Sequence, residues 1–166
     1  MVLSTVVEGQ PTTRTVLLKD VSSAGFTFFT NYNSAKSKAI SEEPRVSLLF
    51  PWYSMERQVI VIGSATRISE SDSANYFASR PWHSKIGAWA SDQSDPLASR
   101  QVLEQRWREF AAKYPEGSEV PKPPHWGGFL VTPTSIESWQ GRYSRLHDRI
   151  RYTRHQMSWK VERFFP

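Results

Sequence analysis

The chain contains no cysteine, which excludes disulfides, thiolate catalysis and any zinc or iron–sulfur site built on cysteine. It also lacks any run approaching the ~20 apolar residues that a membrane-spanning helix needs. Its start, MVLSTVVEGQ, has neither the basic region nor the cleavage site of a signal peptide. We therefore expect no membrane partner and a cytoplasmic location.

Motifs for common metal and nucleotide sites are missing as well. The histidines (His83, His125, His147 and His155) show no HxxxH or HExxH spacing, so we expect no bound metal. The chain also has no GxSxG, Walker A or GxGxxG motif. Other residues must therefore indicate the chemistry.

What the chain does have is a hydrophobic share of 39% over 166 residues, enough for one domain with a core. Lysine and arginine number 21 against 16 aspartates and glutamates, a net charge of +5 that favours anionic partners. The segment SWQGRYSRLHDRIRYTR, residues 138–154, is rich in arginine. By composition alone it suits nucleic acid, a solvated strand face or a small phosphate ligand.

Hydrophobic patterning predicts strands, then helices, then strands again. The predicted strands are 2–7, 13–20, 26–31, 45–52, 56–68, 126–133, 135–141, 148–154 and 158–164. The predicted helices are 34–43, 70–80, 84–94 and 99–114. This order indicates a mostly antiparallel sheet with helices packed outside it, either an α+β domain or a small barrel.

Two local features carry further predictions. Gly63 lies inside a predicted strand and indicates a bulge or a sharp bend. One face of the last predicted helix carries the apolar residues Leu103, Trp107, Phe110 and Tyr114. We expect this face to lie in a core or a subunit interface rather than at a cofactor.

The candidate ligand residues are cations and polar groups on or beside strands. Arg145, His147 and Arg149 alternate, so in a strand all three project to the same side. Tyr76, Arg80 and Ser84 are spaced by four, although Pro81 interrupts a continuous helix. Because cations alternate with apolar residues, a pocket for a phosphate fits better than the exposed basic stripe of a DNA-binding protein. For any single arginine, a solvated or salt-bridged role is about as well supported.

Several segments together resemble a known family. These are RTVLLK, FFTNYNSAKSKAI, RVSLLFPW, ERQVIVIG, YFASRPWHSKIGAWASDQS, VPKPPHWGGF and IESWQGRYSRLHDR. In order and spacing they resemble the FMN-dependent pyridoxamine/pyridoxine 5′-phosphate oxidases, over nearly the whole chain. The resemblance implies a single FMN-binding split β-barrel domain over residues 1–166 with peripheral helices. It also implies a homodimer, with residues 126–166 contributing to the dimer and the active site.

The resemblance also implies residue roles. FMN would contact Arg14, Thr15, Val16, Leu17, Leu18, Lys19, Phe29, Thr30, Lys36, Gln58, Gln93, Ser94, Trp139 and Arg149. The substrate phosphate would be held by Lys19, Tyr76, Arg80 and Ser84. Arg145 and His147 would face the pyridine ring as the catalytic pair, with His147 either positioning the ring or exchanging a proton.

The implied reaction converts pyridoxine or pyridoxamine 5′-phosphate to pyridoxal 5′-phosphate, within vitamin B6 salvage. A hydride equivalent passes from the C4′ carbon to FMN, and dioxygen reoxidises FMN with formation of hydrogen peroxide. Two alternatives remain: a phenazine-pathway flavin oxidase of the same architecture, and a non-catalytic FMN- or pyridoxal-phosphate-binding split barrel. Binding of nucleic acid is not expected.

Three features depart from the family pattern. Ala35 stands where a second cation is usual in the FMN-phosphate loop, and Lys38 is a candidate substitute. Ser138 stands where an aromatic residue is usual before WQG. The chain also starts downstream of the family's N-terminal segment, which normally helps to cover the active site.

Overall fold

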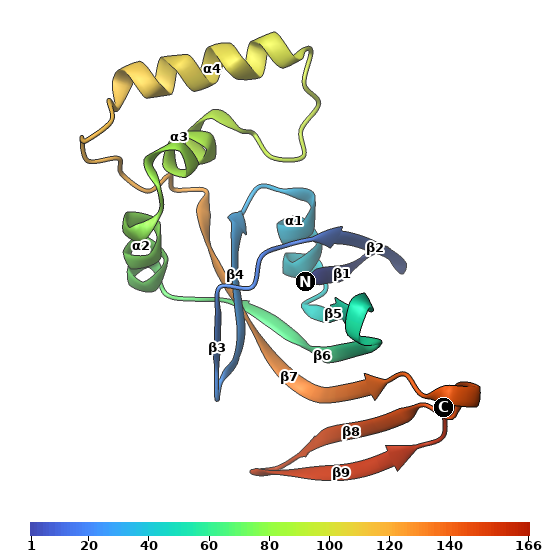
Figure 1. The fold of residues 1–166 in the computed structure, drawn as a ribbon. Coiled ribbons are helices and arrows are strands. Elements are labelled where there is room, and N and C mark those ends of the chain that lie inside the picture. Colours follow the sequence, from blue (N-terminus) through green and yellow to red (C-terminus); the bar gives the residue numbers. More distant parts are fainter. The chain divides into compact units, whose positions relative to one another are not determined.

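The computed structural model describes residues 1–166 as nine strands, four α-helices and two short 3-10 helices (Figure 1). The strands are β1 (Val2–Val7), β2 (Gln10–Thr15), β3 (Asp20–Ser22), β4 (Gly25–Asn31), β5 (Arg45–Trp52), β6 (Arg57–Arg67), β7 (Trp126–Gln140), β8 (Asp148–His155) and β9 (Ser158–Phe164). The helices are α1 (Ala35–Glu42), α2 (Glu70–Ser79), α3 (Trp82–Ala90) and α4 (Arg100–Lys113), with η1 (Tyr53–Met55) and η2 (Tyr143–Arg145). No helix is long and apolar enough to cross a membrane.

All strands belong to one sheet, ordered β2-β1-β5-β6-β7-β4-β3, with β8 pairing with β7 and β9. The pairs β1–β2, β1–β5, β3–β4, β5–β6, β7–β8 and β8–β9 are antiparallel. The predicted mixture of an antiparallel sheet and helices is therefore confirmed. Two strand predictions were wrong: β2 ends at Thr15 rather than at residue 20, and the two predicted strands at 126–133 and 135–141 are one strand, β7.

The chain forms two compact units, which we describe separately. The sheet unit comprises residues 1–28, 39–66 and 130–166, and the helix unit comprises residues 29–38 and 67–129. The prediction of a single domain over residues 1–166 stays a prediction.

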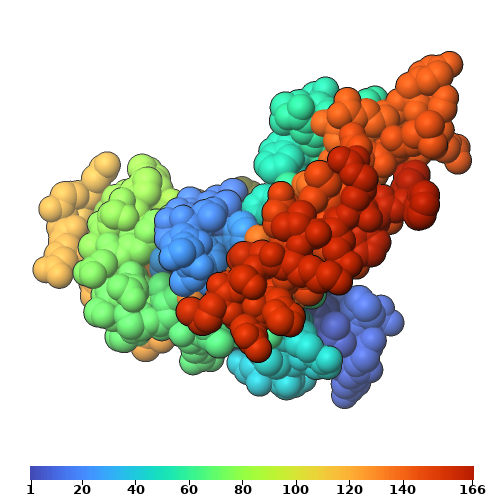
Figure 2. Space-filling view, turned by 90° about the horizontal axis from the view of Figure 1, so that it is seen from below, coloured from blue at the N-terminus to red at the C-terminus, as the bar shows by residue number.

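The core of the sheet unit is built by inward-facing residues of its strands. Leu3, Leu48 and Val61 alternate with more exposed neighbours and are fully buried. In Figures 1 and 2 the C-terminal strands, coloured orange to red, lie side by side. They expose apolar side chains, including Tyr152 and Val161.

Gly63 marks a close approach between strands. Its pairing with β5 is regular, since Val46 faces Gly63 and Ser47 faces Ile62, so the predicted bulge is absent from this pair. A Cβ atom at Gly63 would lie 2.2 Å from the carbonyl oxygen of Thr132 in β7. Only glycine permits this contact, which explains the residue without a bulge.

The helix unit packs α2, α3 and α4 around an aromatic core. Helices α2 and α4 begin where the hydroxyls of Ser69 and Ser99 accept hydrogen bonds from backbone N–H groups. The core residues are Phe77, Ile86, Val120 and Trp126. Trp107, Phe110 and Tyr114 of the predicted apolar face pack against them, so the prediction of a core role is confirmed.

Candidate functional site

The first candidate site lies in the helix unit, around the buried ammonium of Lys36 at the start of α1. Only 8% of Lys36 is exposed. Its Nζ donates hydrogen bonds to Thr30 Oγ1 at 3.2 Å, Ser34 Oγ at 3.3 Å and Gln93 Oε1 at 3.2 Å. These oxygens are neutral and take up the three N–H groups of the ammonium, so an anion that replaced one of them would form a stronger, charge-assisted hydrogen bond. The group fits a phosphate.

We call the oxygens around the Lys36 ammonium the cradle. Gln93 connects the cradle to the segment after α3. Its Oε1 also accepts hydrogen bonds from Thr30 Oγ1 at 3.0 Å and from the Asn31 backbone N–H at 3.4 Å. Ser94 follows with a left-handed φ of 80°, which turns the chain sharply. Thus Thr30, Lys36 and Gln93, predicted from three separate segments, lie together.

The second candidate site of the helix unit is the guanidinium of Arg80, between α2 and α3. Arg80 Cζ lies 4.7 Å from the centre of the Trp126 ring and 5.4 Å from that of Phe77. Burial lowers the pKa of Arg80, and the nearby Tyr76 acts in the opposite direction. Its Nη1 is the one buried side-chain nitrogen or oxygen without a hydrogen-bond partner. Such an unsatisfied donor costs about 1–3 kcal/mol, and an anionic acceptor would remove that cost.

Tyr76 and Ser84 flank Arg80 along the chain. The Tyr76 ring stacks on Phe29 with a centroid distance of 3.9 Å, within the same aromatic cluster as Trp126. Helix α2 ends at Ser79 and Arg80 is extended, with φ −73° and ψ 148°, so Pro81 does break the helix. The Ser84 N–H donates to the Pro81 carbonyl in the first turn of α3.

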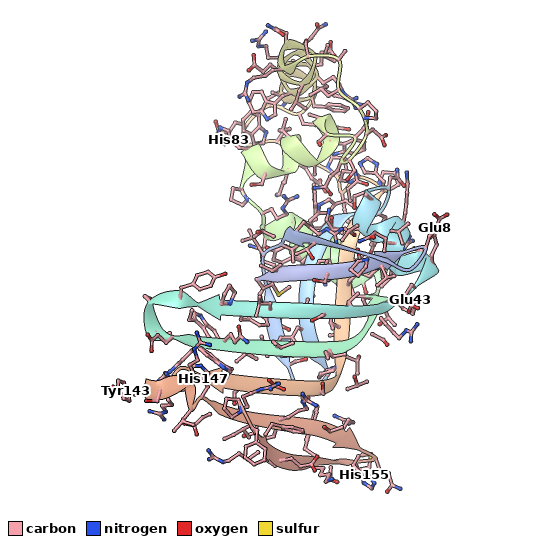
Figure 3. All side chains as sticks on the ribbon, turned by 90° about the vertical axis from the view of Figure 1, so that its right-hand side faces the viewer. Glu8, Glu43, His83, Tyr143, His147 and His155 are labelled. Atoms are coloured by element: carbon pink, nitrogen blue, oxygen red, sulfur yellow. The ribbon has the colours of Figure 1, made fainter.

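In the sheet unit, Trp139 and His147 contact each other and line a hollow. Their ring centroids lie 4.7 Å apart, and the hollow has a volume of about 360 Å³. It is lined by Pro51, Tyr53, Glu56, Arg57, Gln58, Trp139, Gly141, Arg142 and His147. Three predicted residues, Gln58, Trp139 and His147, therefore meet here. Figure 3 shows His147 and Tyr143 on the connection from β7 to β8.

The predicted strand row Arg145, His147, Arg149 was wrong in part. Strand β8 begins at Asp148, so only Arg149 lies in a strand. Arg145 ends η2 with a left-handed φ of 60°, directly after Ser144 with φ 56°. The alternation of side chains along a strand does not apply here, because these residues form a tight turn.

Arg149 is held by a buried carboxylate that the sequence reasoning missed. Glu137, only 7% exposed, accepts hydrogen bonds from Arg149 Nε at 2.9 Å and from Arg151 Nη2 at 2.7 Å. Burial opposes ionisation of Glu137, but the hydrogen bonds from Arg151 and Arg149 outweigh it and lower the pKa of the carboxyl. The sequence feature that could have predicted this contact is the single acidic residue in IESWQG, directly before the arginine-rich segment 138–154.

Arg14 is another residue that was predicted to contact FMN. It lies on β2 and donates to Thr5 Oγ1 at 2.7 Å and Thr12 Oγ1 at 2.6 Å, and burial lowers its pKa. After β2 the backbone N–H of Val16 and of Lys19 donate to the carbonyls of Met1 and Thr27, respectively. The segment Thr15–Lys19 is thus tied to its own unit at both ends.

Comparison with known protein families matches almost the whole chain. The family model described as pyridoxamine 5′-phosphate oxidase matches residues 1–114. The model described as pyridoxine 5′-phosphate oxidase C-terminal dimerisation region matches residues 126–166.

Two curated relatives align over the full chain. A pyridoxine/pyridoxamine 5′-phosphate oxidase of Haemophilus ducreyi is 54% identical over 166 residues, which cover 100% of this chain and 78% of that protein. The protein of the same name from Prochlorococcus marinus is 51% identical over 171 residues, covering 100% of this chain and 77% of that protein.

Two solved structures share the fold. PhzG from Burkholderia lata, in complex with tetrahydrophenazine-1-carboxylic acid, is 28% identical with a TM-score of 0.93, covering 99% of this chain and 80% of that one. A pyridoxamine 5′-phosphate oxidase-related, FMN binding protein from Nostoc punctiforme has a TM-score of 0.78 at 17% identity, covering 99% of this chain and 87% of that one. The expected FMN-binding split-barrel fold is confirmed by these likenesses.

Proposed function

The chain belongs to the pyridoxamine 5′-phosphate oxidase family, and on that premise we propose that it is an FMN-dependent oxidase. Its substrates are pyridoxine 5′-phosphate and pyridoxamine 5′-phosphate, and its product is pyridoxal 5′-phosphate. The two relatives described above carry this name and are more than 50% identical over the whole chain, which supports the same activity here.

The observation that carries the proposal is the buried, unpaired Nη1 of Arg80. The guanidinium is stacked on Trp126, and its Nη1 can donate a hydrogen bond to a phosphate oxygen. We assign the substrate phosphate to Arg80, with Tyr76, Ser84 and Lys19 as further ligands. A substrate without a phosphate would leave the buried Nη1 unsatisfied.

Lys36 supports FMN as the cofactor. Its ammonium supplies donors for the FMN phosphate. The Thr30 hydroxyl donates its one proton to Gln93 Oε1 and accepts from Lys36, so Thr30 and Gln93 together fix the ammonium. When bound, FMN supplies a two-electron acceptor that dioxygen can reoxidise. Formation of hydrogen peroxide in that reoxidation stays a prediction.

The sheet-unit residues have separate proposed tasks. Arg149 offers FMN the N–H groups that Glu137 leaves unused, since Glu137 orients its guanidinium. Gln58 and Trp139 line the hollow beside His147 and complete the flavin contacts. Arg145 and His147 orient the pyridine ring, and Arg145 stabilises charge that develops as the hydride departs. The backbone segment Arg14–Lys19, Phe29 and Ser94 remain proposed FMN contacts.

We also propose that the chain acts as a homodimer in the cytoplasm. The match of residues 126–166 to the dimerisation region supports the dimer. So do the exposed apolar side chains Tyr152, Val161 and Phe165 at the C-terminal strands, because water-exposed apolar clusters favour association.

One other function has an observation in its favour. The TM-score of 0.93 to PhzG supports a phenazine-type flavin oxidase acting on a tricyclic carboxylate. The lower identity of 28% to that protein, against 54% to the Haemophilus oxidase, favours the B6 substrates.

The test is the visible spectrum of the FMN-loaded protein under nitrogen. Addition of pyridoxine 5′-phosphate is expected to bleach the flavin band, and air is expected to restore it with formation of pyridoxal 5′-phosphate. Bleaching by tetrahydrophenazine-1-carboxylic acid alone would favour the second function. A flavin band that neither substrate bleaches would indicate a binding protein, and failure to take up FMN would leave the family assignment as fold only.

A further inference from the structure

The protonation pattern of His147 can be read from its main-chain partner. The backbone N–H of Arg142 donates a hydrogen bond to His147 Nδ1 at 3.1 Å. A backbone amide nitrogen donates only, so Nδ1 is the acceptor and carries no proton. In the neutral ring the single proton must then lie on Nε2.

The donor is held firmly in place. The N–H of Gly141, one residue earlier, donates to the Glu56 carbonyl at 2.7 Å. A Cβ atom at Gly141 would lie 2.8 Å from the Cβ of Glu56, so this approach depends on glycine. On the other side, Arg142 Nε donates to Asp148 Oδ2 at 2.8 Å. The amide of Arg142 therefore cannot rotate away without breaking two other contacts.

The neighbouring carboxylate does not compete for His147. The adjacent pair His147–Asp148 suggests a histidine–aspartate couple in the sequence. In the structure, however, Asp148 gives one oxygen to Arg142 and the other to Arg163. These hydrogen bonds also lower the pKa of Asp148, which keeps it an anion bound to arginine.

We propose that His147 acts on the substrate as a fixed Nε2–H hydrogen-bond donor and not as a proton acceptor, with Arg142 as the positioning residue through its backbone amide. This rests on the proposed function. Neutral His147 has no vacant nitrogen, because Nδ1 is occupied by the amide and Nε2 already bears the proton. The substrate atom that His147 recognises is accordingly a hydrogen-bond acceptor, such as the oxygen attached to the pyridine ring. The alcohol or amine proton of the substrate leaves by another route.

The direct test is nuclear magnetic resonance of the full chain labelled with ¹⁵N-histidine, without and with FMN. Two-bond ¹H–¹⁵N correlations distinguish a pyridine-like from a pyrrole-like nitrogen, and His147→Gln identifies the His147 signals by their loss. We expect a pyridine-like Nδ1 and a pyrrole-like Nε2. The reverse pattern would overturn the proposal. This result does not depend on turnover, so it stands apart from the proposed function.

A second test uses kinetics with matched variants. Glutamine places an N–H donor near the position of Nε2, whereas leucine offers none. We expect His147→Gln to retain about ten times the kcat/KM of His147→Leu, the effect of one substrate hydrogen bond. Equal losses in the two variants would indicate proton transfer by His147 and contradict the proposal. The control His155→Gln, at the exposed end of β8, should match the parent. Absence of any oxidation by the parent would instead refute the proposed function.

Discussion

The ammonium of Lys36 lies 3.2 Å from the side-chain oxygen of Gln93, although 57 residues separate the two in the chain. Thr30 donates to the same oxygen from a third segment. The first contact joins α1 to the segment after α3, and the second joins β4 to the same segment, so the cradle depends on the packing of the helix unit.

Removal of the Lys36 charge should weaken FMN binding. We expect Lys36→Met, which keeps the buried volume, to raise the Kd of FMN about 10- to 100-fold, the effect of one charge-assisted hydrogen bond to phosphate. Quenching of flavin fluorescence measures the Kd. Lys113→Met, at the exposed end of α4, is the matched control and should change the Kd little. Equal effects of both substitutions would show a general charge effect instead.

A cation introduced at position 35 should tighten the binding of FMN. Ala35 is exposed at the first residue of α1, so a long side chain fits there. We expect Ala35→Arg to lower the Kd of FMN about threefold to tenfold, because a second guanidinium adds a charge-assisted contact. Ala35→Gln has similar reach without charge and should have a smaller effect. No tightening in the arginine variant would mean that the phosphate is not near this residue.

Arg80 should make the protein prefer a phosphorylated substrate over an unphosphorylated one. We expect Arg80→Met to raise KM for pyridoxine 5′-phosphate at least about tenfold while kcat changes less, because methionine keeps the packing but not the donors. With unphosphorylated pyridoxine, the variant and the parent should have the same rate of oxidation. The melting temperature of the variant without substrate should not fall, since an unsatisfied buried donor is removed. A fall in kcat alone would place Arg80 outside the phosphate site.

Glu137 should make folding stability depend on pH. Its carboxyl pKa lies below the ordinary value of 4.5, so it stabilises the folded protein above that pH. This stabilisation is lost as the pH falls through the lowered pKa. We expect Glu137→Gln to lower the free energy of unfolding by about 1–3 kcal/mol at pH 7, and the difference to shrink in acid.

Urea denaturation at several pH values measures the effect at Glu137. The exposed Glu116 is the control site, and Glu116→Gln should leave the curve near that of the parent. A difference at Glu137 that grows towards acid would reverse the sign of the argument.

Two glycine substitutions should act in opposite directions. At Gly63 a methyl group would meet the Thr132 carbonyl oxygen at 2.2 Å, so we expect Gly63→Ala to destabilise by about 1–3 kcal/mol. Gly87, inside α3, has no atom within 4 Å of the added carbon. There alanine should stabilise by about 0.5–1 kcal/mol through helix propensity. Thermal unfolding of the two variants provides the comparison, and a stable Gly63→Ala would show that β7 can move aside.

The local pattern of the sequence by itself determined most elements of the fold. Strands β1, β4, β5, β6, β8 and β9 and all four helices were predicted to within a few residues. The apolar face of α4 was also predicted to be buried, because a period near 3.6 residues depends only on neighbouring side chains. The types of ligand residue, mainly arginine and lysine, were visible in the same way.

Only the tertiary structure decided which of these residues meet. Arg145 left the expected strand row because Ser144 and Arg145 take left-handed conformations in a turn, which no alternation pattern reports. Glu137 gained its role from a guanidinium 12 residues away on β8, through the register of β7 and β8. The proton of His147 is likewise placed by one backbone amide. Such contacts depend on long-range register and chain direction, and local hydrophobic periodicity carries no information about either.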